Sequence, residues 1–254
     1  MQTTTEQPMI ETKEFKRQLE SEAREHSTLK HPVFRLVMEL SAAGPEKRDE
    51  LVQLVRFAAR ETYHLTQMFE RYIACLFYNC TVRSERKRLA SNLYEEATGR
   101  LSQTDGHLEL MERFIFAIGI TEEMLEAPPT PETTELIEFR RQMVEDRAQF
   151  HKAAAAIMVA SEFQNIDKVE GQMRHEFLPQ VFGLTEHDMK FFTVHAKEDI
   201  AHVRDGLTMV AAACHTREMQ EEALQSVRDT CDRFWGFYTG IQNNYRDAPE
   251  LLAA

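Results

Sequence analysis

The chain has 254 residues, enough for one large domain or two small ones, and 43% of them are hydrophobic, which is ample for a core. Acidic residues outnumber basic ones by 42 to 30, and the net charge of −12 argues against binding the phosphate backbone of nucleic acids as the main activity. Only 9 Gly and 8 Pro occur, while residues with high helix propensity abound, so we expect an all-α protein.

Turn residues divide the chain into segments of helical periodicity. We expect a flexible tail over residues 1–9 and a loop over 97–106, which contains two Gly. Since no stretch is typical of a linker, we predict one domain over 1–254, a bundle of about eight to ten helices. The expected helices lie at 10–27, from Pro32 onward, and at 45–80, 84–96, 107–118, 121–126, 132–164, 167–181, 185–215 and 217–245.

The four cysteines, Cys75, Cys80, Cys214 and Cys231, form no C-x-x-C pair, so neither a zinc knuckle nor a redox motif is present. Such cysteines are typical of packing residues in a reduced, cytoplasmic protein. The first dozen residues lack an apolar signal core, and no run of about 18 apolar residues occurs. We therefore expect a soluble protein that is not exported and has no membrane partner.

The helix expected over 185–215 places His195, Asp199 and His202 at positions i, i+4 and i+7. At about 100° per residue, the three side chains fall within an arc of roughly 60° and project together. The surrounding residues are largely apolar, which indicates a buried helix. Titratable groups that face a core need partners or a cation, so this motif predicts half of a metal site.

Further ligands must come from other helices that turn polar groups inward. His107 lies on an apolar helical face, although a lone His in that position is more often a core residue. Glu162 ends an Ala-rich apolar run, and the Gly-containing loop lets Glu96 approach His107. Glu95 competes with Glu96, and periodicity does not separate them. Glu70 is a weaker candidate, because Glu is common on helix surfaces.

Nitrogen and oxygen ligands without thiolate suit iron or manganese better than structural zinc, and three carboxylates limit the charge repulsion between two cations. We therefore predict two iron ions per chain, Fe(II) or Fe(III), with O2 as co-substrate. The predicted ligands are Glu96, His107, Glu162, His195, Asp199 and His202.

This set resembles the heme-oxygenase-like diiron oxidases and oxygenases, relatives of the TenA and PqqC proteins, over about residues 55–205. The resemblance rests on Asn92-Leu-x-Glu-Glu96, the loop, His107-Leu-Glu-Leu, Glu162 and the His195-x3-Asp199-x2-His202 motif. It implies a heme-oxygenase-like helical bundle, often a homodimer, and an oxidoreductase whose metal ligands match the six residues above. Some N-oxygenating members add a carboxylate, and Glu70 stands where such a residue would fall.

Members of this family desaturate or cleave aliphatic acids, fragment amino acids, or oxygenate nitrogen. The UndA-type fatty-acid decarboxylases share the His-Asp-His motif but lack the long loop between Glu and His. The resemblance therefore favours a small organic acid derived from an amino acid as substrate. An external electron donor is a further expected partner. The self-sacrificing aminobenzoate-forming branch is less similar, because Ser161 and Gln172 stand where it has a Tyr and a Lys.

Three other interpretations stay open. Glu61-Thr-Tyr-His64 is an E-x-x-H pair, and ferritin-like diiron bundles use two such motifs. A metal-free TenA-like or PqqC-like enzyme, or a small-molecule-binding protein, would use the inward polar groups on an organic ligand, and TenA-type hydrolysis needs a nucleophilic Cys. A purely structural or interaction protein is the third.

Overall fold

The computed structural model describes residues 8–164 and 175–252, without the side chains of residues 197–199. The described residues form helices and no strand, so the predicted all-α class is confirmed. The longer helices are α1 (Thr12–Glu25), α2 (Pro32–Ala42), α3 (Arg48–Asn79), α4 (Arg83–Thr98), α5 (His107–Ala117), α7 (Pro131–Glu145), α10 (Lys190–Ala213) and α11 (Arg217–Asn244). The shorter ones are α6 (Glu122–Leu125), α8 (Phe150–Ala154), α9 (Leu178–Phe182) and the π-helix η4 (Ala155–Ser161).

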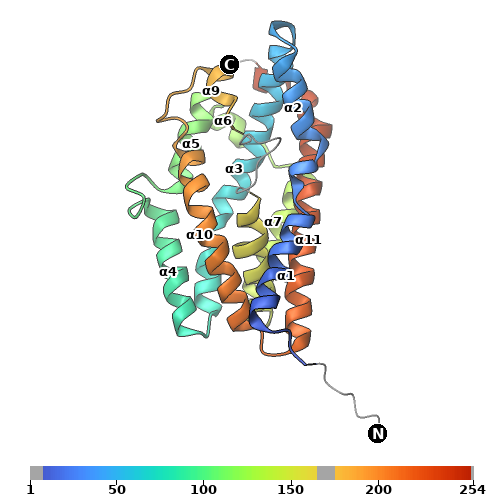
Figure 1. Cartoon of the computed structure of the whole chain (residues 1–254). Helices are drawn as coiled ribbons and strands as arrows, with labels where there is room; N and C mark the ends of the chain where they lie inside the picture. The colour runs from blue at the N-terminus through green and yellow to red at the C-terminus, as the bar shows by residue number, and fades with distance from the viewer. Residues whose placement is uncertain (1–7, 165–174, 253–254) are drawn as a thin grey trace.

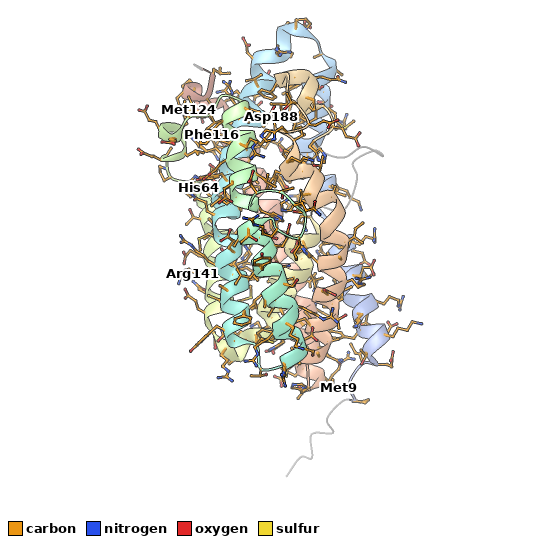
Figure 2. All side chains as sticks on the ribbon, turned by 90° about the vertical axis from the view of Figure 1, so that its left-hand side faces the viewer. Met9, His64, Phe116, Met124, Arg141 and Asp188 are labelled. Atoms are coloured by element: carbon orange, nitrogen blue, oxygen red, sulfur yellow. The ribbon has the colours of Figure 1, made fainter. Side chains whose placement is uncertain are left out.

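These helices run up and down an elongated bundle, with α4 beside α10 and α1 beside α11 (Figure 1). The π-helix η4 packs against both α10 and α11, and α3 contacts α4, α5 and α7. Charged side chains such as Arg141 point outward from the bundle, while Met9 lies at its lower end and Asp188 at its upper end (Figure 2). The long helices therefore enclose an interior to which α3, α4, α5, η4 and α10 all contribute.

Two hydrophobic cores fill this interior. The lower one surrounds η4, where every residue from Ala153 to Ser161 is buried. The upper one joins residues of α2, α3, α5 and α11, including Leu54, Phe114 and Phe237. Burial of such apolar side chains gives about 25 cal/mol per Å² of area removed from water, which is the main favourable contribution to folding.

The continuous helix expected over 132–164 is wrong. It ends at Glu145, because Asp146 adopts an extended backbone conformation and its side chain accepts a hydrogen bond from the amide of Ala148. Asp favours this capping role over a helix interior. The chain then continues through the 3-10 turn η3 (Arg147–Gln149), α8 and η4.

The helix expected from residue 185 begins five residues later, at Lys190. Asp188 accepts hydrogen bonds from the amide and hydroxyl of Thr185, and these local bonds form a turn before the helix. The helix expected over 167–181 lies mostly outside the described residues, which retain α9 at its end. Most of the tail expected over 1–9 also lies outside them, and the single-domain organisation stays a prediction. Among the described residues, no helix is both long and apolar enough to cross a membrane.

His31 links the start of α2 to α11. Its Nδ1 accepts a hydrogen bond from the amide of Val33, so Nε2 carries the proton and faces the Thr239 hydroxyl at 3.1 Å. The ring is 3% exposed, and burial lowers its pKa from 6.5 to about 4. Protonation would remove the acceptor that caps α2.

We expect the free energy of unfolding to fall as the pH drops from 6.5 towards 4. In this range His31 becomes protonated in the unfolded chain but stays neutral in the folded one. The loss should not exceed about 3 kcal/mol. Urea unfolding at pH 7 and at pH 4.5 measures it. His31→Asn keeps a capping oxygen but cannot titrate, so its loss should be smaller. Equal losses in the two proteins would contradict this role.

Candidate metal centre

Five of the predicted ligands lie close together inside the bundle. One group consists of Glu96, His107 and His195, and a second of Glu96, Glu162 and His202; within each, one ligand atom per residue lies within 4.8 Å of the others. Glu96 belongs to both groups. The side chain of Asp199, the sixth predicted ligand, lies outside the described residues.

The loop between α4 and α5 brings Glu96 and His107 together. Gly99 ends α4 in a left-handed conformation with φ of 59°, and a Cβ there would lie 2.0 Å from the carbonyl oxygen of Asp105. His107 is the first residue of α5, and its Nδ1 lies 2.7 Å from Glu96 Oε2. The loop therefore closes tightly enough for residues on two helices to share one site.

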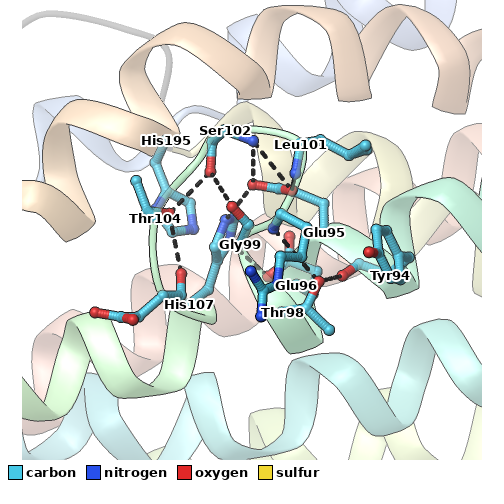
Figure 3. Close-up of polar contacts among 12 residues, drawn as sticks. Tyr94, Glu95, Glu96, Thr98, Gly99, Leu101, Ser102, Thr104, His107 and His195 are labelled. Carbon is cyan, nitrogen blue, oxygen red and sulfur yellow. Dashed lines mark hydrogen bonds and ion pairs between the residues drawn. The ribbon is translucent and has the colours of Figure 1, made fainter.

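Glu95 and Glu96 have different surroundings. Glu95 accepts hydrogen bonds from the amides of Leu101 at 2.7 Å and Ser102 at 3.2 Å, so it holds the loop in place (Figure 3). Its carboxylate is 3.7 Å from His107, whereas Glu96 contacts the same ring directly. The geometry favours Glu96 over Glu95 as the carboxylate of the cluster.

On the opposite side, η4 positions Glu162 against α10. π-helices are rare and often occur at functional sites, where the extra residue changes the direction of the side chains that follow. Gly206 of α10 allows close packing here, because a Cβ would lie 2.2 Å from the Met158 carbonyl oxygen. Glu162 Oε1 consequently lies 3.4 Å from His202 Nδ1.

The orientation of His195 suits metal binding. Its Nδ1 lies 2.7 Å from the carbonyl oxygen of Phe191, which can only accept, so Nδ1 carries the proton. This leaves the lone pair on Nε2. The ring lies 4.6 Å from that of His107, centroid to centroid. Burial, with His107 nearby, lowers the pKa of His195 to about 4 and keeps the ring neutral.

The two carboxylates of the cluster differ electrostatically. Burial alone would raise the pKa of Glu96, but its contact with His107 and the nearby His195 and His202 outweigh burial and lower it. Burial raises the pKa of Glu162, and His202 only partly opposes this. Both side chains are almost fully buried, and Glu162 Oε1 makes no hydrogen bond of good geometry within the described part of the chain. A cation would compensate these groups, and their nitrogen and oxygen donors fit iron.

Two further polar residues lie near the cluster. Burial raises the pKa of Glu70, as do Glu109 and Glu96, but Glu70 belongs to neither group of closely spaced ligand atoms. Asn92 precedes Glu96 by one turn of α4 and is 6% exposed, and neither amide atom has a hydrogen-bond partner within the described residues. The sequence motif includes Asn92, but only the structure shows that its amide is buried.

Glu61 of the E-x-x-H pair has a structural role. Its carboxylate accepts hydrogen bonds from the amide of Thr130 at 2.9 Å and from the hydroxyls of Thr130 at 3.1 Å and Thr133 at 2.6 Å. Arg60 lies 3.4 Å away as a counter-charge. Glu61 thus holds the start of α7, and its oxygens already have partners. This counts against a ferritin-like centre at Glu61 and His64.

The four cysteines are reduced. Burial raises the pKa of each thiol, to about 12 for Cys214 and Cys231. A nucleophilic cysteine needs a lowered pKa, so these thiols are poorly suited to hydrolysis of the TenA type.

Solved structures share this fold. A TenA homolog from Pseudomonas syringae superposes with a TM-score of 0.68 at 18% identity, covering 93% of this chain and 97% of that one. A protein from Shewanella denitrificans with a heme oxygenase-like fold gives 0.67 at 17% identity, covering 94% and 95%. The protein is therefore a heme-oxygenase-like helical bundle, as the sequence resemblance implied.

Proteins with similar sequences indicate the family to which the chain belongs. A 4-aminobenzoate synthase from Nitrosomonas europaea is 26% identical over 247 residues, 92% of this chain and 93% of its own length. One from Chlamydia muridarum is 24% identical over 182 residues, covering 70% and 72%. A family described as iron-containing redox enzymes matches residues 56–235. The chain belongs to this family and is an iron oxidoreductase, which confirms the predicted enzyme class.

If Glu61 is structural, Glu61→Ala should destabilise the fold without changing metal binding. Three buried hydrogen bonds to a carboxylate are lost, and we expect a loss of about 3 kcal/mol or more in urea unfolding. Thr133→Val, which removes one of them, should cost about 1–2 kcal/mol. The exposed Glu123→Ala is the control and should change little. Loss of iron from the still folded Glu61→Ala protein would instead favour the E-x-x-H centre.

Proposed function

We propose that this chain is a non-heme diiron oxidase or oxygenase that uses O2 and holds two irons through Glu96, His107, Glu162, His195, Asp199 and His202. The observation that carries this proposal is the position of Glu96 in both groups of buried ligand atoms. A carboxylate shared in this way would help to hold two cations. When bound, iron supplies the capacity to bind and reduce dioxygen.

Neighbouring groups in the protein orient the proposed ligands and set their protonation states. The Phe191 carbonyl fixes the tautomer of His195, so the ring presents Nε2 without rearrangement. His107 holds Glu96 in its ionised form, and the packing of α10 on η4 sets His202 against Glu162. Because Glu96, His107 and Glu162 are buried, their surroundings limit the access of bulk water to them.

The substrate and the partners are proposed on less direct grounds. The family resemblance supports a small organic acid, derived from an amino acid, that undergoes desaturation, C–C cleavage or N-oxygenation. It also supports a homodimer, and oxygen chemistry of this kind supports an external electron donor. A cytoplasmic location fits the reduced cysteines.

Synthesis of 4-aminobenzoate is the second candidate function, because relatives of that name align with most of this chain. Against it, residue 161 is a buried Ser that donates to the Ala156 carbonyl, where the resemblance to that branch leads us to expect a Tyr. Gln172, the other departure, lies outside the described residues. Release of 4-aminobenzoate after iron loading and exposure to oxygen, detected by mass spectrometry, would favour this candidate.

A metal-free TenA-like or PqqC-like enzyme, or a small-molecule-binding protein, is the alternative outside iron chemistry. It would use the same buried imidazoles and carboxylates to hold an organic ligand. Membership of an iron-containing family and the raised pKa values of the thiols weigh against it.

Iron content after anaerobic loading with Fe(II) tests the two-ion proposal. The wild-type protein should hold about two irons per chain, and His195→Ala and His202→Ala about one each, because each loses a ligand from a different group. Glu96→Ala should weaken both sites. Circular dichroism checks that each variant is helical.

His187→Ala is the matched control, because His187 is exposed and precedes α10. It should retain the wild-type iron content. One iron in the wild-type protein, or unchanged content in Glu96→Ala, would contradict a shared carboxylate. Absence of iron from the loaded wild-type protein would favour the metal-free alternative.

A further inference from the structure

An apolar cavity of about 220 Å³ lies next to the cluster, between α2, α3, α5, α10 and α11. Its walls are rich in aromatic side chains, among them Phe34, Phe114, Phe191, Phe192 and Tyr238. The metal-centre residue His195 forms part of one wall. The cavity and the first group of ligand atoms therefore share a residue, so a molecule in this cavity would lie against the cluster.

The described walls of this cavity contain no Asp, Glu, Lys or Arg. The polar side chains in the described walls are those of Thr62, His175, His195 and Tyr238, and the Thr62 hydroxyl already donates to the Ala58 carbonyl at 2.8 Å. Transfer of an unpaired charged group from water into such surroundings is strongly unfavourable. The described walls therefore favour a bound molecule whose body is uncharged.

Two buried arginines, Arg56 and Arg140, have partners outside the cavity. Arg56 donates to the carbonyl oxygens of Ile118 at 2.6 Å and Leu251 at 2.7 Å. Arg140 lies between the rings of Tyr72 and Phe234 and contacts Ser161. Neither is among the described residues that line the cavity. No described arginine is thus placed to anchor a charged substrate body there.

A second hollow reaches the cluster from the other side. It lies between α4 and α10, has one wall at His202, and is lined by Lys87, Arg88 and Asp205 among others. This α4–α10 groove is lined by charged and polar side chains as well as apolar ones, and its Arg88 and Asp205 pair with each other. A charged substrate would be expected here, whereas an apolar one would bind in the aromatic cavity. The two hollows would therefore bind substrates that differ in charge.

We propose that the aromatic cavity binds the organic substrate, and that this substrate has an uncharged apolar body, an aromatic ring or a short aliphatic chain, with its polar end at His195. This proposal rests on the proposed oxidase function and narrows its substrate class. Apolar cavities of about 150 Å³ hold benzene, so the volume here accommodates a ring with a short side chain. Amino-acid-derived acids with apolar side chains fit, and those with charged side chains do not.

Calorimetric binding to the metal-free and the iron-loaded protein tests this assignment. The apolar probes are 3-phenylpropanoate and octanoate, and the charged-body probes are lysine and glutamate. We expect both apolar probes to bind the iron-loaded wild-type protein at least about tenfold more tightly than either charged one. Moving the apolar part of a probe from water into the cavity is favourable, whereas moving an unpaired charged group there is not. Binding to the metal-free protein should be weaker but retain this order.

Two variants fill the cavity from different helices, Ala58→Phe on α3 and Val37→Phe on α2. Each should weaken binding of the apolar probes by about tenfold or more, as a steric block requires. Ser91→Phe, which obstructs the α4–α10 groove instead, is the matched control and should change their affinity less than about twofold. Circular dichroism verifies the fold of each variant.

Tighter binding of lysine or glutamate, or loss of binding in Ser91→Phe but not in the cavity variants, would overturn the assignment. So would the absence of apolar-probe binding at millimolar concentration. Because probe binding is also measured without iron, failure of this assignment is distinguishable from failure of the diiron proposal, which would appear in the iron content.

Discussion

The buried contact between the Glu96 carboxylate and the His107 ring is the constraint on which the site depends. It requires a loop that brings the end of α4 close to the start of α5, which Gly99 and the hydrogen bonds of Glu95 provide. It also places an ionised carboxylate in the interior, where α10 must bring compensating groups. Glu96 belongs to both groups of closely spaced ligand atoms, and the proposed pair of cations would compensate its charge.

Some of this could be predicted from the sequence. The spacing of His195 and His202 places both on one face of a helix, because the helical repeat is regular. The choice between Glu95 and Glu96 could not be made, since neighbouring helical positions are about 100° apart and only the loop contacts distinguish them. The break at Asp146 and the π-helix were likewise missed, because both depend on local hydrogen bonds that compete with a strongly helical pattern.

The hollows in which a substrate could bind could not be predicted from the sequence. The sequence of α10 does not show that this helix lines two separate hollows, so the aromatic cavity and the α4–α10 groove became distinguishable only in three dimensions. The polar pair Glu61 and His64 illustrates the converse. Its spacing is typical of a metal ligand, yet Glu61 is already occupied by threonine hydroxyls and an amide. Spacing alone does not show whether a buried carboxylate is available.

Anomalous X-ray diffraction at the iron absorption edge, from crystals of the iron-loaded protein, tests the central claim most directly. The account predicts two anomalous peaks on either side of the Glu96 carboxylate, one adjacent to His107 and His195 and the other to Glu162 and His202. Bound iron that gives peaks away from Glu96, or only a single peak at full occupancy, would contradict it.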